Sequence, residues 1–179
     1  MTRTIEVVPH DPKWAARFRK EAVFLKSIFG PEMLDVHHIG STSVPGLAAK
    51  PIIDLLVEVA DISKIDAYND RLSELGYIPK GEFGIPGRRF FIKGSEENRT
   101  HHIHVFATGS ACVAQHLVLR DYLVAHPQDA EAYGRLKEVL APQFPQDITG
   151  YMRGKNDFIH DLLERAGAWS SRCAAEDGP

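Results

Sequence analysis

Residues 38–59 read HIGSTSVPGLAAKPIIDLLVEV and place a Gly-Ser turn between two apolar runs. Side chains alternate across an extended strand, so in the run from Ile52 to Val59 the acids Asp54 and Glu58 share one face, whereas the other face is wholly apolar. A carboxylate in an apolar strand is costly unless it is paired, hydrogen-bonded or close to a cation. The stretch therefore predicts a sheet with one packed face and one face that carries a polar site.

The composition is that of a globular chain with a hydrophobic core. With 179 residues, of which 44% are hydrophobic, one domain is expected. The net charge of -3 gives no broad basic surface, so nucleic acid is not an expected partner. The two cysteines, Cys112 and Cys173, fit a reducing compartment, and no apolar run suits a secretory signal or a membrane span. We expect a cytoplasmic protein without a membrane partner, and the oligomeric state stays open.

Apolar periodicity predicts the order of helices and strands. A helix is expected to start at Asp11-Pro12 and to end at Gly30-Pro31. Further strands are expected at about 33–39, 52–59, 88–93 and 102–106, and further helices at about 61–75, 110–125, 128–140 and 155–168. Early strands and late helices favour an α+β fold. We expect a single domain over residues 1–169 and a disordered tail at 170–179.

The Gly-Ser turn is a candidate phosphate site. Backbone N–H groups and hydroxyls at such a turn can hold a phosphate, although a simple strand-to-helix connection shows the same pattern. Lysines and arginines elsewhere could neutralise phosphate charge, although most such side chains are merely solvated. The expected phosphate-binding residues are Gly40, Ser41, Thr42, Ser43, Lys50, Arg89 and Lys155.

The segment RTHHIHVF, residues 99–106, is a second candidate site. His102 and His104 share one face of a predicted strand, where two imidazoles can bind a divalent metal or contact a phosphate. Incidental histidines on a surface strand are the alternative, since the chain has 9 histidines in all.

Residues 38–59 resemble the signature of the GrpB family of nucleotidyltransferase-like proteins, which is also found fused to dephospho-CoA kinase. Other matching segments follow in order over about residues 5–168: VVPHDPKWAARFRKEA, THHIHVF, RDYLVAHPQDAEAYGRLK and GYMRGKNDFIHDLLERA. The resemblance implies a nucleotidyltransferase (polymerase-beta-like) fold of the α+β class, with a mixed β-sheet packed with helices.

The resemblance also implies the site residues. The superfamily pattern is Gly-Ser followed by two strand acids that hold Mg²⁺; Gly40, Ser41 and Asp54 match it, whereas Leu56 replaces the second acid. Glu58 on the same strand face could replace it as a catalytic residue beside Asp54. Asp54, His102 and His104 would be the metal ligands, with Mg²⁺ or Mn²⁺ as the ion and Zn²⁺ as another candidate for a His-containing site.

Three functions are compatible with this pattern. The first is metal-dependent transfer of a nucleotide from a nucleoside triphosphate to a hydroxyl of a small molecule or protein. The second is a non-catalytic nucleotide or phosphometabolite binding module, which the loss of an acid at Leu56 favours. The third is a metal-dependent phosphate-ester hydrolase that uses His102 and His104. The sequence leaves open which of these functions the chain performs.

Overall fold

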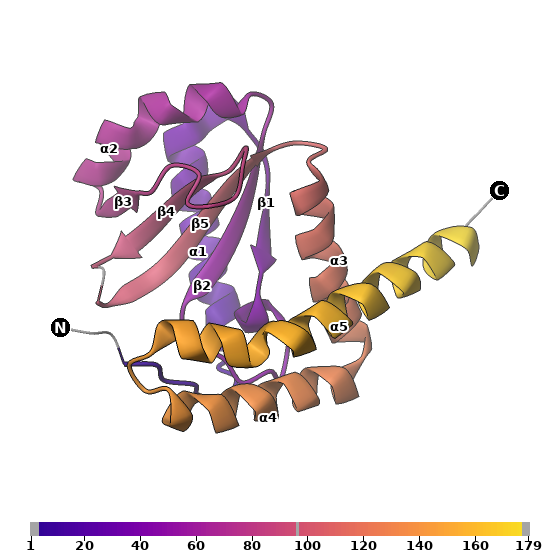
Figure 1. The fold of residues 1–179 in the computed structure, drawn as a ribbon. Helices are drawn as coiled ribbons and strands as arrows, with labels where there is room; N and C mark the ends of the chain where they lie inside the picture. Colours follow the sequence, from indigo (N-terminus) through magenta and orange to yellow (C-terminus); the bar gives the residue numbers. More distant parts are fainter. Residues whose placement is uncertain (1–3, 96, 177–179) are drawn as a thin grey trace.

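The computed structural model describes residues 4–95 and 97–176, and in these residues it contains a mixed sheet with the strand order β1-β2-β5-β4-β3 (Figure 1). β2 and β5 are parallel, whereas all other neighbouring strands are antiparallel. The expected α+β class, with a mixed sheet packed with helices, is confirmed. The strands are β1 (Met33–Ile39), β2 (Ile53–Val59), β3 (Tyr77–Pro79), β4 (Arg89–Gly94) and β5 (Arg99–Ala107).

One face of the sheet is covered by α1 (Lys13–Phe29), which lies behind the strands in Figure 1. The first turn of α1 follows Asp11, whose side chain accepts a hydrogen bond of 2.9 Å from the Lys13 N–H. Buried side chains of α1, such as Trp14 and Leu25, join the main core with the apolar face of β2. The 3-10 helix Ile62–Tyr68 and the short α2 (Asn69–Glu74) add Ile65 and Leu72 to the same core.

The opposite face of the sheet meets the later helices. Val113 of α3 (Ala111–Ala125) packs with Leu56 of β2. In Figure 1, α4 (Pro127–Gln143) and α5 (Ile148–Glu176) cross one end of the sheet. Val44 and Leu47, which follow the Gly-Ser turn, pack into a core shared by α3, α4 and α5. This packing brings the two last helices close to the turn.

The C-terminal helix differs from its expected length. α5 extends from Ile148 to Glu176, beyond the expected 155–168 and through most of the segment expected to be a disordered tail. Trp169 explains part of this difference, because its ring packs edge-on against Tyr122 and His126 at 5.9 and 5.7 Å between centroids. The last three residues of the expected tail, 177–179, lie outside the described residues.

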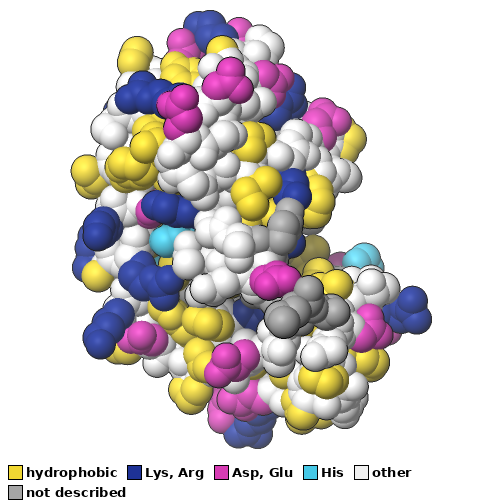
Figure 2. All heavy atoms as spheres, turned by 90° about the vertical axis from the view of Figure 1, so that its left-hand side faces the viewer, with side chains coloured by type: hydrophobic (Ala, Val, Ile, Leu, Met, Phe, Trp, Pro, Cys, Tyr) yellow, Lys and Arg dark blue, Asp and Glu magenta, His cyan; other side chains and the backbone are white. Residues whose placement is uncertain are grey.

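Two other elements differ from the prediction. The segment expected as one helix at 61–75 begins with a 3-10 helix, Ile62–Tyr68, and is α-helical only from Asn69 to Glu74. Strand β3 was not predicted; it has only three residues, which pair with β4. Within the described ranges, no helix is both long enough and apolar enough to cross a bilayer. Acidic and basic side chains are both spread over the face shown in Figure 2.

Candidate nucleotide-binding site

Asp54 accepts hydrogen bonds from two histidines of the neighbouring strand. Because β2 and β5 are parallel in register, Asp54 lies opposite His102. His102 Nδ1 and His104 Nε2 lie 3.1 and 3.3 Å from the same oxygen, Asp54 Oδ1. Burial opposes ionisation, but the hydrogen bonds from the two imidazoles outweigh it and hold the pKa of Asp54 well below its usual value. The carboxylate is therefore charged throughout the neutral pH range.

Gly40 is required by the position of Asp54. It has φ +70°, a conformation that favours glycine, and a Cβ at this position would lie 2.8 Å from Asp54 Oδ2. The adjacent Ile39 pairs with Asp54 across β1 and β2, which sets this close approach. The Gly-Ser turn and the strand acid are therefore one local structure, in which the backbone of the turn covers the carboxylate.

A cavity of about 400 Å³ opens beside Asp54. The sheet and the Gly-Ser turn form one wall, and α3, α4 and α5 supply the other. The predicted residues that line it are Gly40, Ser41, Thr42, Lys50, Asp54, His102, His104 and Lys155; the further polar lining residues are His116, Tyr133, Lys137 and Tyr151. The structure thus brings most of the predicted site into one hollow.

Three lysines make the cavity cationic: Lys137 and Lys155 from the helical wall, and Lys50 from the loop before β2. Lys137 is only 3% exposed, and its Nζ has no hydrogen-bond partner and lies 4.5 Å from the Tyr133 ring centroid. Lys50 Nζ and Lys155 Nζ lie 5.1 and 4.8 Å from the Tyr151 ring centroid. Burial, followed by the charges of Lys155 and Lys50, lowers the pKa of Lys137 to about 7. Burial also lowers the pKa of Lys155. A bound polyanion would relieve the repulsion between these ammonium groups.

Three predicted residues do not line the cavity. The Ser43 hydroxyl donates to the Gly40 carbonyl oxygen at 2.5 Å. Glu58 lies further along β2, where its oxygens contact His37 Nε2 at 2.7 Å and the Thr108 hydroxyl at 2.8 Å.

Arg89, the third of them, forms a two-point ion pair with Asp66 at 2.6 and 2.9 Å. Residue spacing on a strand correctly places Glu58 on the face of Asp54. The same spacing cannot predict how far the cavity extends along β2, and the cavity does not reach Glu58.

Four polar lining residues were missed in the sequence. Tyr133 and Lys137 lie on the buried face of α4, together with Ala130, Gly134 and Leu140. This spacing is a detectable signal, because a lysine on the apolar stripe of a helix is exceptional unless it serves a site. His116 and Tyr151 carry no comparable local signal. Burial lowers the pKa of His116 to about 4, so its imidazole is neutral at pH 7.

The site has fewer carboxylates for a metal ion than the two strand acids of the superfamily pattern. Asp54 is the one carboxylate among the described residues that line the cavity. Leu56, at the position of the second acid, is fully buried in an apolar cluster with Ile39 and Phe106. One carboxylate with imidazole nitrogen suits Mn²⁺ or Zn²⁺ better than Mg²⁺. By the chemistry of its donors, the site fits a divalent ion of that kind.

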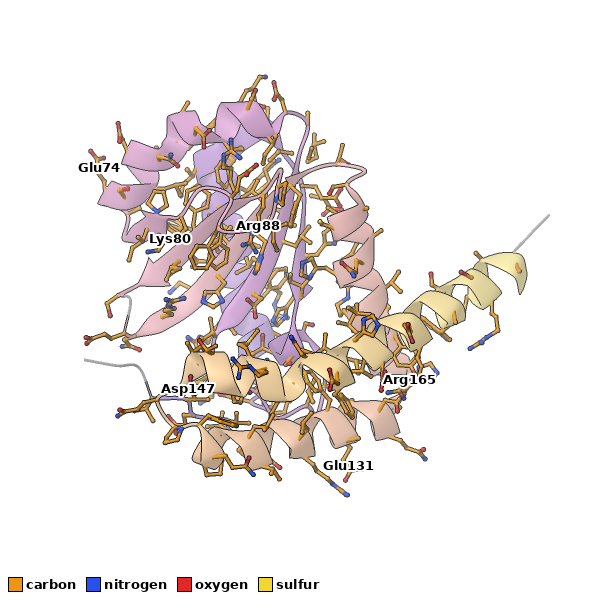
Figure 3. The ribbon with its side chains drawn as sticks, in the orientation of Figure 1. Glu74, Lys80, Arg88, Glu131, Asp147 and Arg165 are labelled. Atoms are coloured by element: carbon orange, nitrogen blue, oxygen red, sulfur yellow. The ribbon has the colours of Figure 1, made fainter. Side chains whose placement is uncertain are left out.

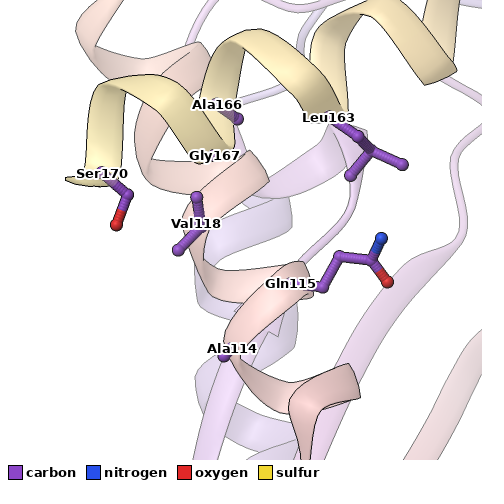
Figure 4. A pocket seen from close by; sticks show the side chains of 7 residues that line it. All are labelled: Ala114, Gln115, Val118, Leu163, Ala166, Gly167 and Ser170. Carbon is purple, nitrogen blue, oxygen red and sulfur yellow. The ribbon is translucent and has the colours of Figure 1, made fainter.

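A separate group of metal-ligand type lies on β1 and β2. Ligand atoms of Asp35, His37 and Glu58 all lie within 4.8 Å of one another, outside the cavity. A smaller hollow of about 210 Å³ lies between α3 and α5 (Figure 4). Its lining offers the Gln115 amide and the Ser170 hydroxyl but no titratable side chain, so it lacks the chemistry of the main cavity.

Comparison with known proteins assigns the chain to a family. The model of the GrpB protein family matches residues 4–165. The UPF0157 protein YqkA of Bacillus subtilis is 46% identical over 93% of this chain, and the match spans 48% of the length of YqkA. The crystal structure of the conserved protein GrpB from Enterococcus faecalis matches with a TM-score of 0.86 and 43% identity, over 90% of this chain and 96% of that one. The chain belongs to the GrpB family, as its signature residues predicted.

Structural neighbours also include a nucleotidyltransferase. The structure of Cid1 in complex with the UTP analogue UMPNPP matches with a TM-score of 0.42 and 13% identity, over 83% of this chain and 48% of that one. This similarity is too low to carry an argument about activity.

Proposed function

We propose that the chain is a metal-dependent nucleotidyltransferase, which moves a nucleotide from a nucleoside triphosphate to a hydroxyl of a small molecule or protein. The observation that carries the proposal is the position of Lys137. Its ammonium group is buried without a hydrogen-bond partner in the cavity that Lys50, Lys155 and Asp54 also line. Burying a cation in this way is unfavourable unless an anion joins it. A triphosphate supplies such an anion.

Two groups of lining residues would have different roles in the reaction. Lys50, Lys137 and Lys155 would bind the phosphate groups, beside the hydroxyl and backbone of Ser41. Asp54 would lie at the reacting phosphorus, where the acceptor oxygen forms a P–O bond as the bond to pyrophosphate breaks. A divalent ion held by Asp54 and an imidazole would neutralise the charge that develops on the phosphoryl oxygens. Glu58 does not line the cavity, so the proton of the acceptor hydroxyl would leave to water and not to Glu58.

Pyrophosphate release tests the proposal. The chain is incubated with labelled nucleoside triphosphates, Mg²⁺ or Mn²⁺, and small-molecule and protein acceptors. We expect turnover by the parent, and a rate at least about a hundredfold lower in Asp54→Asn, because the neutral amide no longer supplies the negative charge that would hold the divalent ion. The matched control is Lys20→Met, at an exposed position on α1. Lack of turnover across all acceptors and both metals, by protein that binds the nucleotides, would reject the transferase.

A binding module is the second candidate, and Leu56 favours it. Leu56 is fully buried among apolar side chains, so this position cannot supply a second metal-binding acid. Calorimetry distinguishes the two functions: nucleotide binding that needs Lys137 but is never followed by turnover would indicate the module. Both candidates place the chain in the cytoplasm, where nucleotides are abundant and the free Cys112 and Cys173 stay reduced.

A further inference from the structure

Arg88 connects the segment before β4 to the candidate site. Figure 3 shows it over the sheet, and it is only 5% exposed. Its Nε and Nη2 donate to the carbonyl oxygens of Glu82 and Phe83 at 3.1 and 2.7 Å. Its Nη1 lies 3.3 Å from His104 Nδ1, and its guanidinium also packs 4.7 Å from the Phe90 ring centroid. These contacts give the guanidinium one orientation relative to His104.

The contact with Arg88 decides where His104 carries its proton. A guanidinium has only N–H donors and stays protonated in proteins, so His104 Nδ1 must be the acceptor. The imidazole proton then lies on Nε2, which is the nitrogen 3.3 Å from Asp54 Oδ1. The hydrogen bonds therefore run in one direction, from Arg88 to His104 to Asp54.

We propose that Arg88 is a positioning residue that holds His104 as an N–H donor to Asp54 and thereby keeps His104 from binding a metal ion. A metal on His104 Nε2 would need the proton on Nδ1, where it would face an N–H of Arg88. This inference concerns the chain before any substrate binds, and it does not depend on nucleotide transfer. It differs from the expectation that His104 is a metal ligand.

His102 is in a different environment. Its Nδ1 lies 3.1 Å from Asp54 Oδ1, but its buried Nε2 has no hydrogen-bond partner. No hydrogen-bond donor therefore holds this second nitrogen as an acceptor, and the His102 ring is able to change tautomer. A divalent ion beside Asp54 would accordingly take His102 as its imidazole ligand and leave His104 in place.

The tautomer is measured directly in the unmodified protein. Long-range ¹⁵N–¹H spectra of chain labelled at histidine nitrogen, assigned with His104→Gln, distinguish the two tautomers at neutral pH. We expect the Nε2–H form of His104. The Nδ1–H form would overturn the proposal. This measurement needs no change at Arg88, so it also decides the question if variants at Arg88 do not fold.

Zinc titration of the variants tests the consequence. All are made with His37→Gln, which removes a ligand of the separate group on β1. We expect Arg88→Met to bind Zn²⁺ at least tenfold more tightly, because His104 is then free to turn its lone pair to the ion. The gain should vanish when His104→Gln is added, and Arg88→Lys, again a donor only, should stay near the parent.

Arg89→Met is the matched control for the zinc titration, because this guanidinium pairs with Asp66 instead. Its affinity for Zn²⁺ should equal that of the parent. An unchanged affinity in folded Arg88→Met, or a gain that survives His104→Gln, would overturn the proposal.

Discussion

Replacing Lys137 by methionine should stabilise the chain while weakening its binding of anions. The pKa of Lys137 is lowered from 10.5 to about 7, because the folded chain buries the ammonium near Lys155 and Lys50. Between these two pH values the unfolded chain binds more protons than the folded chain, so the stability of the parent rises with pH. Well below pH 7 the folded chain bears the full free-energy cost of burying the Lys137 ammonium, and above pH 10.5 this cost is absent.

The size of the effect follows from the two pKa values. Each pH unit between them is worth about 1.4 kcal/mol, and at pH 7 the folded chain has already lost half of this proton, so the advantage of Lys137→Met over the parent should shrink by about 2 kcal/mol between pH 7 and pH 9. Methionine keeps most of the stem volume and needs no hydrogen bond, which limits the packing change. Lys20→Met, at an exposed position, should show no such pH dependence.

Urea unfolding at pH 6, 7, 8 and 9 measures the stability difference, and calorimetry with tripolyphosphate at pH 7 measures binding. Lys137→Met should bind tripolyphosphate at least about tenfold more weakly, because a desolvated cation is lost from the site. A parallel pH dependence of the parent and Lys137→Met would refute the reasoning. So would a variant that is more stable but binds the anion equally well.

Three further changes have defined outcomes. Gly40→Ala should lower the free energy of unfolding by at least about 1 kcal/mol more than Gly46→Ala in urea titrations. Both glycines have positive φ, but only at Gly40 would the methyl group meet Asp54. Because burial lowers the pKa of His116 to about 4, this residue makes the parent less stable as the pH falls from 6.5 to 4. His116→Phe should therefore lose less stability over this range, by about 1.4 kcal/mol per pH unit. An unchanged dependence of the free energy of unfolding on pH would contradict this. Leu56→Asp should cost about 3 kcal/mol or more and Leu56→Met less than about 1.5, because the acid enters an apolar cluster; equal thermal unfolding temperatures would argue against that environment.

Local patterns identified the elements that present the site. The apolar alternation of β2 correctly separated the core face from the face of Asp54, and the spacing of His102 and His104 correctly put both rings on one face of β5. These inferences succeed because the side-chain direction on a strand depends only on its two-residue period. The same rule could not reveal that Glu58 contacts His37 and Thr108 instead of the cavity, since that depends on which elements end nearby.

The sequence by itself determined the α+β class, the GrpB family, and the pairing of a glycine turn with a strand acid. Only the tertiary structure decided that β2 and β5 are parallel neighbours in a register that joins Asp54 to His102. It also decided that Lys137 enters the cavity from α4 and that Arg88 contacts His104. Periodicity records which face of an element is buried, but not which distant element covers it. Contacts between residues far apart along the chain arise only when packing selects one arrangement of the sheet and helices.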